Sequence, residues 1–234
     1  MLPELTDSKN NIALLLFSRT VKEEAETKGF SSKSKRVNYA ISNKLYQHTR
    51  AICRHTGLAL FSSPNVQKGD SFAEKLVNEI DSIFQLGYEK IIVVGSDSPN
   101  LNVSHLLHTK ELLNAGNRLV LGPSLDGGVY LIGLDAQNCN SVAFLDLPWQ
   151  SPDLLEELKK FDEKTYLLEW LADIDSEKDL HHYLNNTVNK DIVRVLKNLI
   201  LSSTPKTFIE LTINRQLIYT HTLFRGPPLT ITLQ

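Results

Sequence analysis

The sequence predicts an α/β protein in which helices cover both faces of a mostly parallel sheet. Short apolar runs at 12–17, 58–61 and 91–94 alternate with longer segments whose apolar residues recur at helical spacing. The runs are continuously apolar, which is typical of parallel strands buried on both faces. The alternation of strands and helices predicts right-handed crossovers and a three-layer α/β/α arrangement.

Helices are expected between these strands. Residues 37–52 carry apolar side chains at helical spacing. Ser71 and Glu74 have the spacing of a capping box, which predicts a helix over 72–84. A third helix is expected to start at Ser104 and to stop before a glycine at 116.

The second half of the chain continues the pattern and then changes character. Two further strands, 119–121 and 129–134, flank a Gly-rich tight connection. Helix starts are expected at Ser151-Pro152 and at Ser176, and apolar residues recur at helical spacing again over 192–199. After Pro205 the runs FIELTI and QLIYTHTLF are typical of a β-hairpin or edge strands. We therefore expect a main domain over residues 1–184 and a C-terminal helix and β extension over 185–234.

Composition and charge exclude several classes of protein. The chain has 234 residues, 41% of them hydrophobic, and a net charge of −2, which supplies no general field for nucleic acid or an anionic membrane. The longest apolar run is too short to span a bilayer, and the first residues lack the pattern of a signal peptide. Cys53 and Cys139 have no metal-ligand spacing and are expected to be reduced thiols. A cytoplasmic location is expected.

Polar residues follow two of the predicted strands. Phe17-Ser18-Arg19 comes after the first, and Ser96-Asp97-Ser98 comes after the third. Ligands of open parallel sheets bind beyond the carboxyl ends of the strands, so both segments are candidates for a binding site. Asp97 is a hard oxygen ligand suited to Mg²⁺ or Mn²⁺. The alternative is that Asp97 caps a turn or the next helix.

A second candidate lies in LGPSLDGGVYLIGL, residues 121–134. Gly127 and Gly128 have no side chain where a sugar could approach the backbone, and Asp126 offers a carboxylate to a hydroxyl, a metal or an amine. A simple hairpin turn explains the same residues. Asp173 and Asp175 are a third candidate, for metal binding, but Asp-Ser-x-x-Asp before a leucine stripe is better explained as the start of a helix.

A basic segment completes the set of candidates. It contains Lys28, Lys33, Lys35 and Arg36, which could neutralise a diphosphate at the mouth of the sheet. Lysines in a polar loop are more often simply solvated.

Four motifs in one order, GSDSPNL, LGPSLDGGVYLIGL, DLPWQSPDLLEEL and LADIDSEKDL, resemble a bacterial glycosyltransferase-like family of the glycosyltransferase A fold. The resemblance covers roughly residues 11 to 184 and implies a nucleotide-diphospho-sugar transferase architecture.

The resemblance also implies roles for individual residues. It implies a divalent metal, Mg²⁺ or Mn²⁺, at Asp97, a nucleotide pocket lined by Ser96 and Ser98, and a donor sugar or acceptor facing Asp126, Gly127 and Gly128. The implied contacts to the base are Gln67, Gly69 and Asp70.

The expected activity is sugar transfer from a nucleotide-diphosphate donor to an acceptor that the sequence does not identify. Asp126 is the expected base. The metal at Asp97 is expected to offset charge on the departing diphosphate, supplemented by Lys33, Lys35 and Arg36. Arg19 could replace the first lysine of the family's phosphate-binding loop. One alternative is nucleotidyl transfer from a nucleoside triphosphate, which the missing Pro-x-x-Gly and Lys-Thr-Arg-Leu motifs disfavour. Another is a non-catalytic protein that binds a nucleotide, or that assembles through its C-terminal strands, for example as a homodimer.

Overall fold

The computed structural model describes residues 11–31, 34–62, 64, 67–187 and 190–201. The chain divides into two units, Met1–Thr204 and Pro205–Gln234. Every described residue lies in the first unit, so the predicted C-terminal β extension, and a dimer formed through it, fall outside the described residues.

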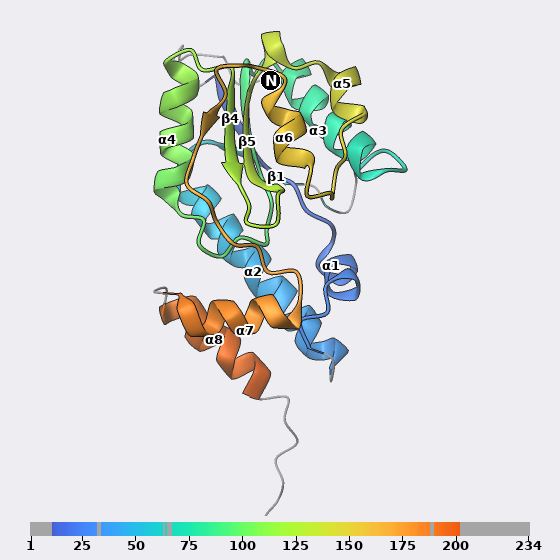
Figure 1. The fold of residues 1–234 in the computed structure, drawn as a ribbon, viewed down its shortest axis with the longest axis vertical. Coiled ribbons are helices and arrows are strands. Elements are labelled where there is room, and N and C mark those ends of the chain that lie inside the picture. The colour runs from blue at the N-terminus through green and yellow to red at the C-terminus, as the bar shows by residue number, and fades with distance from the viewer. Residues whose placement is uncertain (1–10, 32–33, 63, 65–66, 188–189, 202–234) are drawn as a thin grey trace, which may run out of the picture. The chain divides into compact units, whose positions relative to one another are not determined.

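The described part of the first unit is built on a six-stranded sheet in the order β2-β1-β3-β5-β4-β6 (Figure 1). β1 pairs in parallel with β2 and β3, and β4 pairs in parallel with β6. β5 is antiparallel to both of its neighbours, β3 and β4. The predicted α/β class with a mostly parallel sheet is therefore confirmed. The strands are β1 (Ile12–Leu16), β2 (Ala59–Phe61), β3 (Lys90–Val94), β4 (Leu119–Pro123), β5 (Val129–Asp135) and β6 (Tyr166–Leu167).

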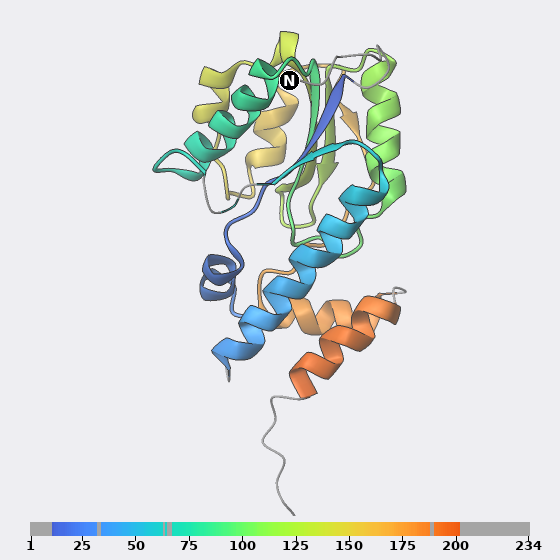
Figure 2. The same ribbon diagram turned by 180° about the vertical axis from the view of Figure 1, so that it is seen from behind.

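Helices cover both faces of the sheet, because successive strand residues point to opposite sides. Leu15 and Val93 belong to a core shared with one group of helices, and Leu14 and Ile92 belong to a core on the other face. Figures 1 and 2 show the two groups on either side of the sheet. On the first face lie α3 (Phe72–Gln85), α5 (Ser141–Leu145) and α6 (Leu154–Lys159); on the second lie α4 (Val103–Asn114) and the C-terminal part of α2 (Lys35–His55).

A third core lies beyond the sheet, where the N-terminal half of α2 meets α7 (Glu177–Asn186) and α8 (Lys190–Leu201). Phe30, Ile41 and Leu180 are buried there. Figure 2 shows α2 running from the sheet to these two helices. The boundary predicted after residue 184 falls in the last turn of α7, and the division into domains stays a prediction.

Some elements differ from the sequence-based expectation. α1 (Val21–Thr27) was not predicted, because it buries no residue and so has no apolar stripe; Thr20 and Glu23 form its capping box. α4 starts at Val103 with Asn102 as its cap, rather than at Ser104. α6 follows Asp153 rather than Ser151. The two-residue strand β6 and a short 3₁₀ helix, η1 (Ala136–Asn138), were also not predicted, since both are too short to show a period.

No helix among the described residues is long and apolar enough to cross a membrane. Cys53 and Cys139 are both free, as predicted.

Candidate functional site

A cavity of about 630 Å³ opens beyond the carboxyl ends of β1 and β3. Because β1 and β3 are parallel neighbours with Leu16 opposite Val94, the residues that follow them lie side by side. Phe17, Ser18 and Arg19 line the cavity from one strand, and Ser96 and Asp97 line it from the other. The structure thus brings together two segments that the sequence separates by almost eighty residues.

A long extended segment brings two more carboxylates to this cavity. After β6 the chain continues beside β4, with the Leu171 amide donating to the Pro123 carbonyl at 3.1 Å, and the Ile174 amide donating to the Asp97 carbonyl at 3.0 Å. Successive side chains of an extended chain point to opposite sides. Ile174 is fully buried in the third core, whereas Asp173 and Asp175 line the cavity.

Lys28 lies at the centre of the charged residues in the cavity. Its Nζ atom is 2.6 Å from Asp97, 2.7 Å from Asp175 and 2.9 Å from Glu24, and its side chain is only 9% exposed. Lys28 donates a hydrogen bond to Asp97 and forms ion pairs with Asp175 and Glu24, so one ammonium group balances three carboxylates. Arg19 is a second cation at the site, 3.5 Å from Glu24.

These contacts set the charge states of the cluster. Burial alone would lower the pKa of Lys28, but the three carboxylates raise it above its usual value, so Lys28 is charged. Burial alone would raise the pKa of Asp97, but the charge and hydrogen bond of Lys28 bring it below its usual value. Burial raises the pKa of Asp175, although Lys28 opposes the change.

Asp173 behaves differently from its neighbours. Burial and the nearby charge of Asp97 raise its pKa to about 7, while a hydrogen bond from the Ser98 hydroxyl opposes the rise. Two carboxylates whose pKa values move in opposite directions are typical of sites that hold and release a proton. Ser98 is buried, and the structure places it as a partner of Asp173.

The Asp-Gly-Gly motif forms the connection between β4 and β5. The Asp126 carboxylate is exposed at the cavity rim and accepts a hydrogen bond of 3.0 Å from the Gly128 amide. Gly128 lines the cavity. Gly127 has a φ of +92°, and a Cβ atom there would lie 2.2 Å from the Pro152 carbonyl oxygen, so chain packing accounts for this glycine.

Two smaller cavities adjoin the first. One of about 520 Å³ shares Phe17 and Arg19 with it and contains Gln67, Asp70 and Lys75. The side-chain amide of Gln67 donates a hydrogen bond of 3.0 Å to the Ser18 carbonyl, which joins this region to the end of β1. The other, of about 340 Å³, shares the aspartates at 126, 173 and 175 with the main cavity.

Other predicted residues lie away from these cavities. Lys35 and Arg36 are exposed in the first turn of α2, and Lys33 lies outside the described residues. Gly69 has a φ of +126° and packs against Glu74 at the start of α3. Its place is therefore explained by the turn into the helix.

Residues 42–151 match a protein family described as "Uncharacterized protein conserved in bacteria (DUF2064)". The chain resembles this bacterial family, as the motifs implied. No curated protein matches the sequence significantly.

Solved structures share the fold. A "putative nucleotide-diphospho-sugar transferase" from Desulfovibrio desulfuricans G20 is 17% identical, covers 82% of this chain and 98% of its own, and superposes with a TM-score of 0.68. A Mycobacterium sp. strain JC1 homologue of a Mycobacterium tuberculosis protein covers the same shares at 10% identity, but its TM-score of 0.44 carries no argument. At 17% identity the likeness to the first structure shows a shared fold alone.

The predicted divalent metal finds no ready ligand set in this arrangement. The Asp97 carboxylate that was expected to bind it is bound to Lys28. Within the described part of the chain, no group of three or more His, Cys, Asp or Glu side chains is placed to hold a metal ion. As arranged, these carboxylates fit an ammonium group rather than a metal, and the metal stays a prediction.

Sequence reasoning undervalued two features of the site. It treated Asp173 and Asp175 as the start of a helix, although their i, i+2 spacing would place both on one side of an extended chain. It treated Lys28 as one of several solvated lysines and did not single out Glu24. The i, i+4 spacing of Glu24 and Lys28 is a local signal for their pairing. No local signal marks Lys28 as the partner of Asp97 and Asp175, because these are distant in the sequence.

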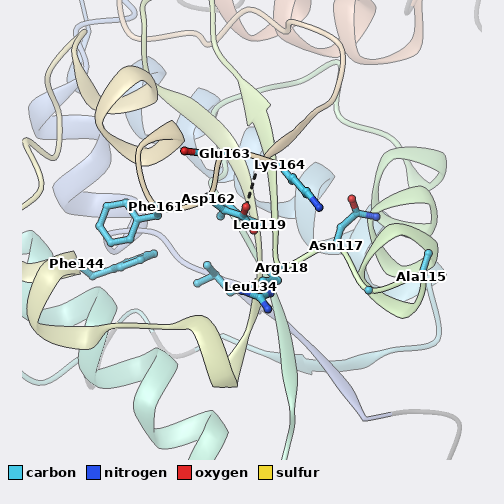
Figure 3. A pocket seen from close by; sticks show the side chains of 11 residues that line it. Ala115, Asn117, Arg118, Leu119, Leu134, Phe144, Phe161, Asp162, Glu163 and Lys164 are labelled. Atoms are coloured by element: carbon cyan, nitrogen blue, oxygen red, sulfur yellow. Dashed lines mark hydrogen bonds between the residues drawn. The ribbon is translucent and has the colours of Figure 1, made fainter.

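A further cavity of about 680 Å³ lies elsewhere, where β4 begins and β5 ends (Figure 3). Phe144 and Phe161 lie on one side of it, with ring centroids 5.2 Å apart, and Asn117 and Lys164 lie on the other. This cavity lacks the buried ion pairs of the first and opens at the amino end of the parallel strand β4, so we do not assign the site to it.

Proposed function

We propose that this chain binds a nucleotide-diphospho-sugar and transfers its sugar to an acceptor. The observation that carries the proposal is the row of three adjoining cavities at the carboxyl ends of β1 and β3, in a fold shared with a protein described as such a transferase. A transferase needs separate binding sites for the donor and the acceptor, and the two sites must adjoin where the reaction takes place. The main cavity meets each smaller cavity along shared residues, as such an arrangement requires.

The donor would occupy the two cavities that share Phe17 and Arg19. In this proposal the nucleoside lies beside Gln67 and Asp70, and the diphosphate lies against Arg19, whose guanidinium has N–H groups in the geometry that phosphate oxygens favour. The sugar would extend toward Asp97 and Gly128. Lys28 also lines the cavity, but its ammonium group is already paired with three carboxylates.

The acceptor would enter the cavity of about 340 Å³ and present a hydroxyl at the shared wall. Its oxygen would form a bond to the anomeric carbon while the bond from that carbon to the diphosphate oxygen breaks. The nucleoside diphosphate leaves with the bonding electrons, and the proton passes from the hydroxyl to a carboxylate. Arg19 would offset the charge on the departing diphosphate.

Three aspartates, at 126, 173 and 175, border both cavities, and Asp175 is paired with Lys28. The other two could take this proton. Asp126 is the base predicted from the sequence, and Asp173 is the second candidate. A general base works best when its pKa is near the working pH, which favours Asp173 with its pKa of about 7. Activities of Asp126→Asn and Asp173→Asn would separate them: the base variant should lose about 10²–10⁴-fold in kcat, and the other much less.

The direct test is calorimetry and thermal shift with a panel of nucleotide sugars and nucleoside triphosphates, with and without Mn²⁺. A ligand that binds only the folded protein raises its apparent stability. We expect one class of nucleotide sugar to bind, and release of its nucleoside diphosphate once an acceptor is present. Binding of triphosphates alone, with release of pyrophosphate, would instead favour nucleotidyl transfer. No binding by any member of the panel would contradict both enzymatic functions.

A further inference from the structure

We propose that the ammonium group of Lys28 is the resident cation of the carboxylate cluster formed by Glu24, Asp97 and Asp175, at the place where a divalent metal was predicted. The sequence predicted a metal from the position of Asp97 and from a family resemblance. The structure places a positively charged side chain within hydrogen-bond distance of that same carboxylate.

The size of the cluster matches an ammonium group. The three carboxylate oxygens lie 2.6, 2.7 and 2.9 Å from Nζ, which are ordinary lengths for charge-assisted N–H···O hydrogen bonds. Oxygen ligands of Mg²⁺ lie at about 2.0–2.1 Å, so the same oxygens are too far from this centre to bind that ion. A metal placed here would also meet the positive charge of Lys28.

The backbone holds Lys28 in this position. Lys28 is the C-cap of α1, and its amide donates to the Glu24 carbonyl at 2.8 Å. The next residue, Gly29, pairs with Ser176 in an isolated parallel bridge, and Phe30 is buried in the third core. The side chain therefore enters the cluster from a chain segment anchored on both sides. Moving it out would leave three carboxylates close together without a cation.

The consequence for the reaction is that the cluster operates without a bound divalent ion. This consequence rests on the proposed function, whereas the assignment of Lys28 as the cation does not. The assignment of Lys28 also separates the roles of the two cations. Lys28 orders the carboxylates, whereas Arg19 forms one ion pair among the described residues, at 3.5 Å from Glu24, and remains able to reach a phosphate.

The test is a titration with Mn²⁺ alone, followed by calorimetry and by the electron paramagnetic resonance signal of free Mn²⁺. The proteins compared are the wild type, Asp97→Asn, Lys28→Met, and the double variant Lys28→Met/Asp97→Asn. We expect only weak, non-saturable Mn²⁺ binding in the wild type. Lys28→Met should gain one saturable site, with an affinity at least about tenfold above that weak binding. The double variant should lose this site. Lys28→Arg keeps the charge and should resemble the wild type.

Two results would overturn the proposal. The first is one Mn²⁺ bound per wild-type chain and lost in Asp97→Asn. The second is a folded Lys28→Met protein, judged by circular dichroism, that gains no Mn²⁺ site.

If Lys28→Met does not fold, the wild type still decides. The Nζ signal of Lys28 in ¹⁵N NMR should persist when Mn²⁺ is added. If Mn²⁺ bound at the cluster, paramagnetic broadening would remove this signal in the wild type, and the signals of nearby residues would persist in Asp97→Asn. That result would overturn the proposal.

A separate arm distinguishes this proposal from the function proposed above. Binding of nucleotide sugars is measured in EDTA and in Mn²⁺. Equal binding in both supports a metal-free site, and binding that needs Mn²⁺ together with Asp97 contradicts it. Absence of binding in both would count against the function while the Mn²⁺ titration still decides the role of Lys28.

Discussion

The Nζ atom of Lys28 lies 2.6 Å from Oδ2 of Asp97, although 69 residues separate them in the sequence. This ion pair joins the end of α1 to the loop after β3, and through Asp175 it also joins the segment that leads into α7. One side chain therefore fixes three parts of the chain that form the wall of the cavity.

Removing Lys28 should lower the free energy of unfolding. Lys28→Met leaves three carboxylates without their cation, and breaking a buried ion pair from one side costs about 3–5 kcal/mol. Glu24 and Asp175 keep some contact with water, so we expect about 2–3 kcal/mol at pH 7, decreasing toward pH 4 as the carboxylates become protonated. Urea denaturation of the wild type and Lys28→Met would measure this loss in the free energy of unfolding.

Lys159→Met is the matched control for that variant. Lys159 pairs with Glu156 on an exposed helix surface, where such pairs contribute about 0–1 kcal/mol. If both variants lost the same free energy of unfolding, the role of Lys28 in stabilising the carboxylate cluster would be contradicted.

Asp173 should make stability fall as pH rises. Its pKa in the folded protein is about 7, above the value of about 3.9 for an aspartate in an unfolded chain. Between these values the folded state holds a proton that the unfolded state has lost, so the contribution of Asp173 is present below about pH 4 and is lost as pH rises through about 7. Asp173→Asn cannot ionise and should lack this decline.

The measurement is urea denaturation from pH 4 to pH 8, in which the difference between wild type and Asp173→Asn should change by a few kcal/mol at most. Asp146→Asn, at an exposed position at the end of α5, is the control and should follow the wild type. A constant difference between wild type and Asp173→Asn would contradict the prediction.

Arg19 should contribute to donor binding. If the diphosphate lies against its guanidinium, Arg19→Ala removes a charge-assisted contact, and the dissociation constant of the nucleotide sugar should rise about 10- to 100-fold. Arg118→Ala provides a control of the same chemistry, since Arg118 lines the cavity of Figure 3 at the other end of β4. Isothermal titration would compare them, and similar affinities for both variants would remove Arg19 from the donor site.

Alanine substitutions at three glycines separate the energetic cost of backbone strain from the cost of a steric clash. The new Cβ of Gly29→Ala meets open space, so this variant should leave the free energy of unfolding nearly unchanged. At position 116 the space is also open, but the backbone φ is +94°, which an alanine adopts at a cost of about 1 kcal/mol. Gly127→Ala combines a positive φ with a Cβ 2.2 Å from the Pro152 carbonyl oxygen and should cost several kcal/mol. Thermal unfolding should rank the variants in that order, and a stable Gly127→Ala protein would contradict the packing argument.

The sequence by itself determined the strands and helices that have a clear hydrophobic pattern or a capping residue. The five longer strands and helices α2, α3 and α7 lie close to their predicted positions, because continuous apolar runs, apolar faces and residues such as Ser71 and Ser176 act over one or two turns of chain. It also determined which strand ends carry polar side chains.

Only the tertiary structure decided how those side chains combine. Local pattern did not mark Lys28 as different from other lysines in a polar segment, since its partners at positions 97 and 175 become neighbours only when β3 and the 168–176 segment pack together. The raised pKa of Asp173 has the same origin, because burial and the charge of Asp97 act through space. Short-range preferences follow from the sequence, whereas the electrostatics of the site depend on distances that only the folded chain defines.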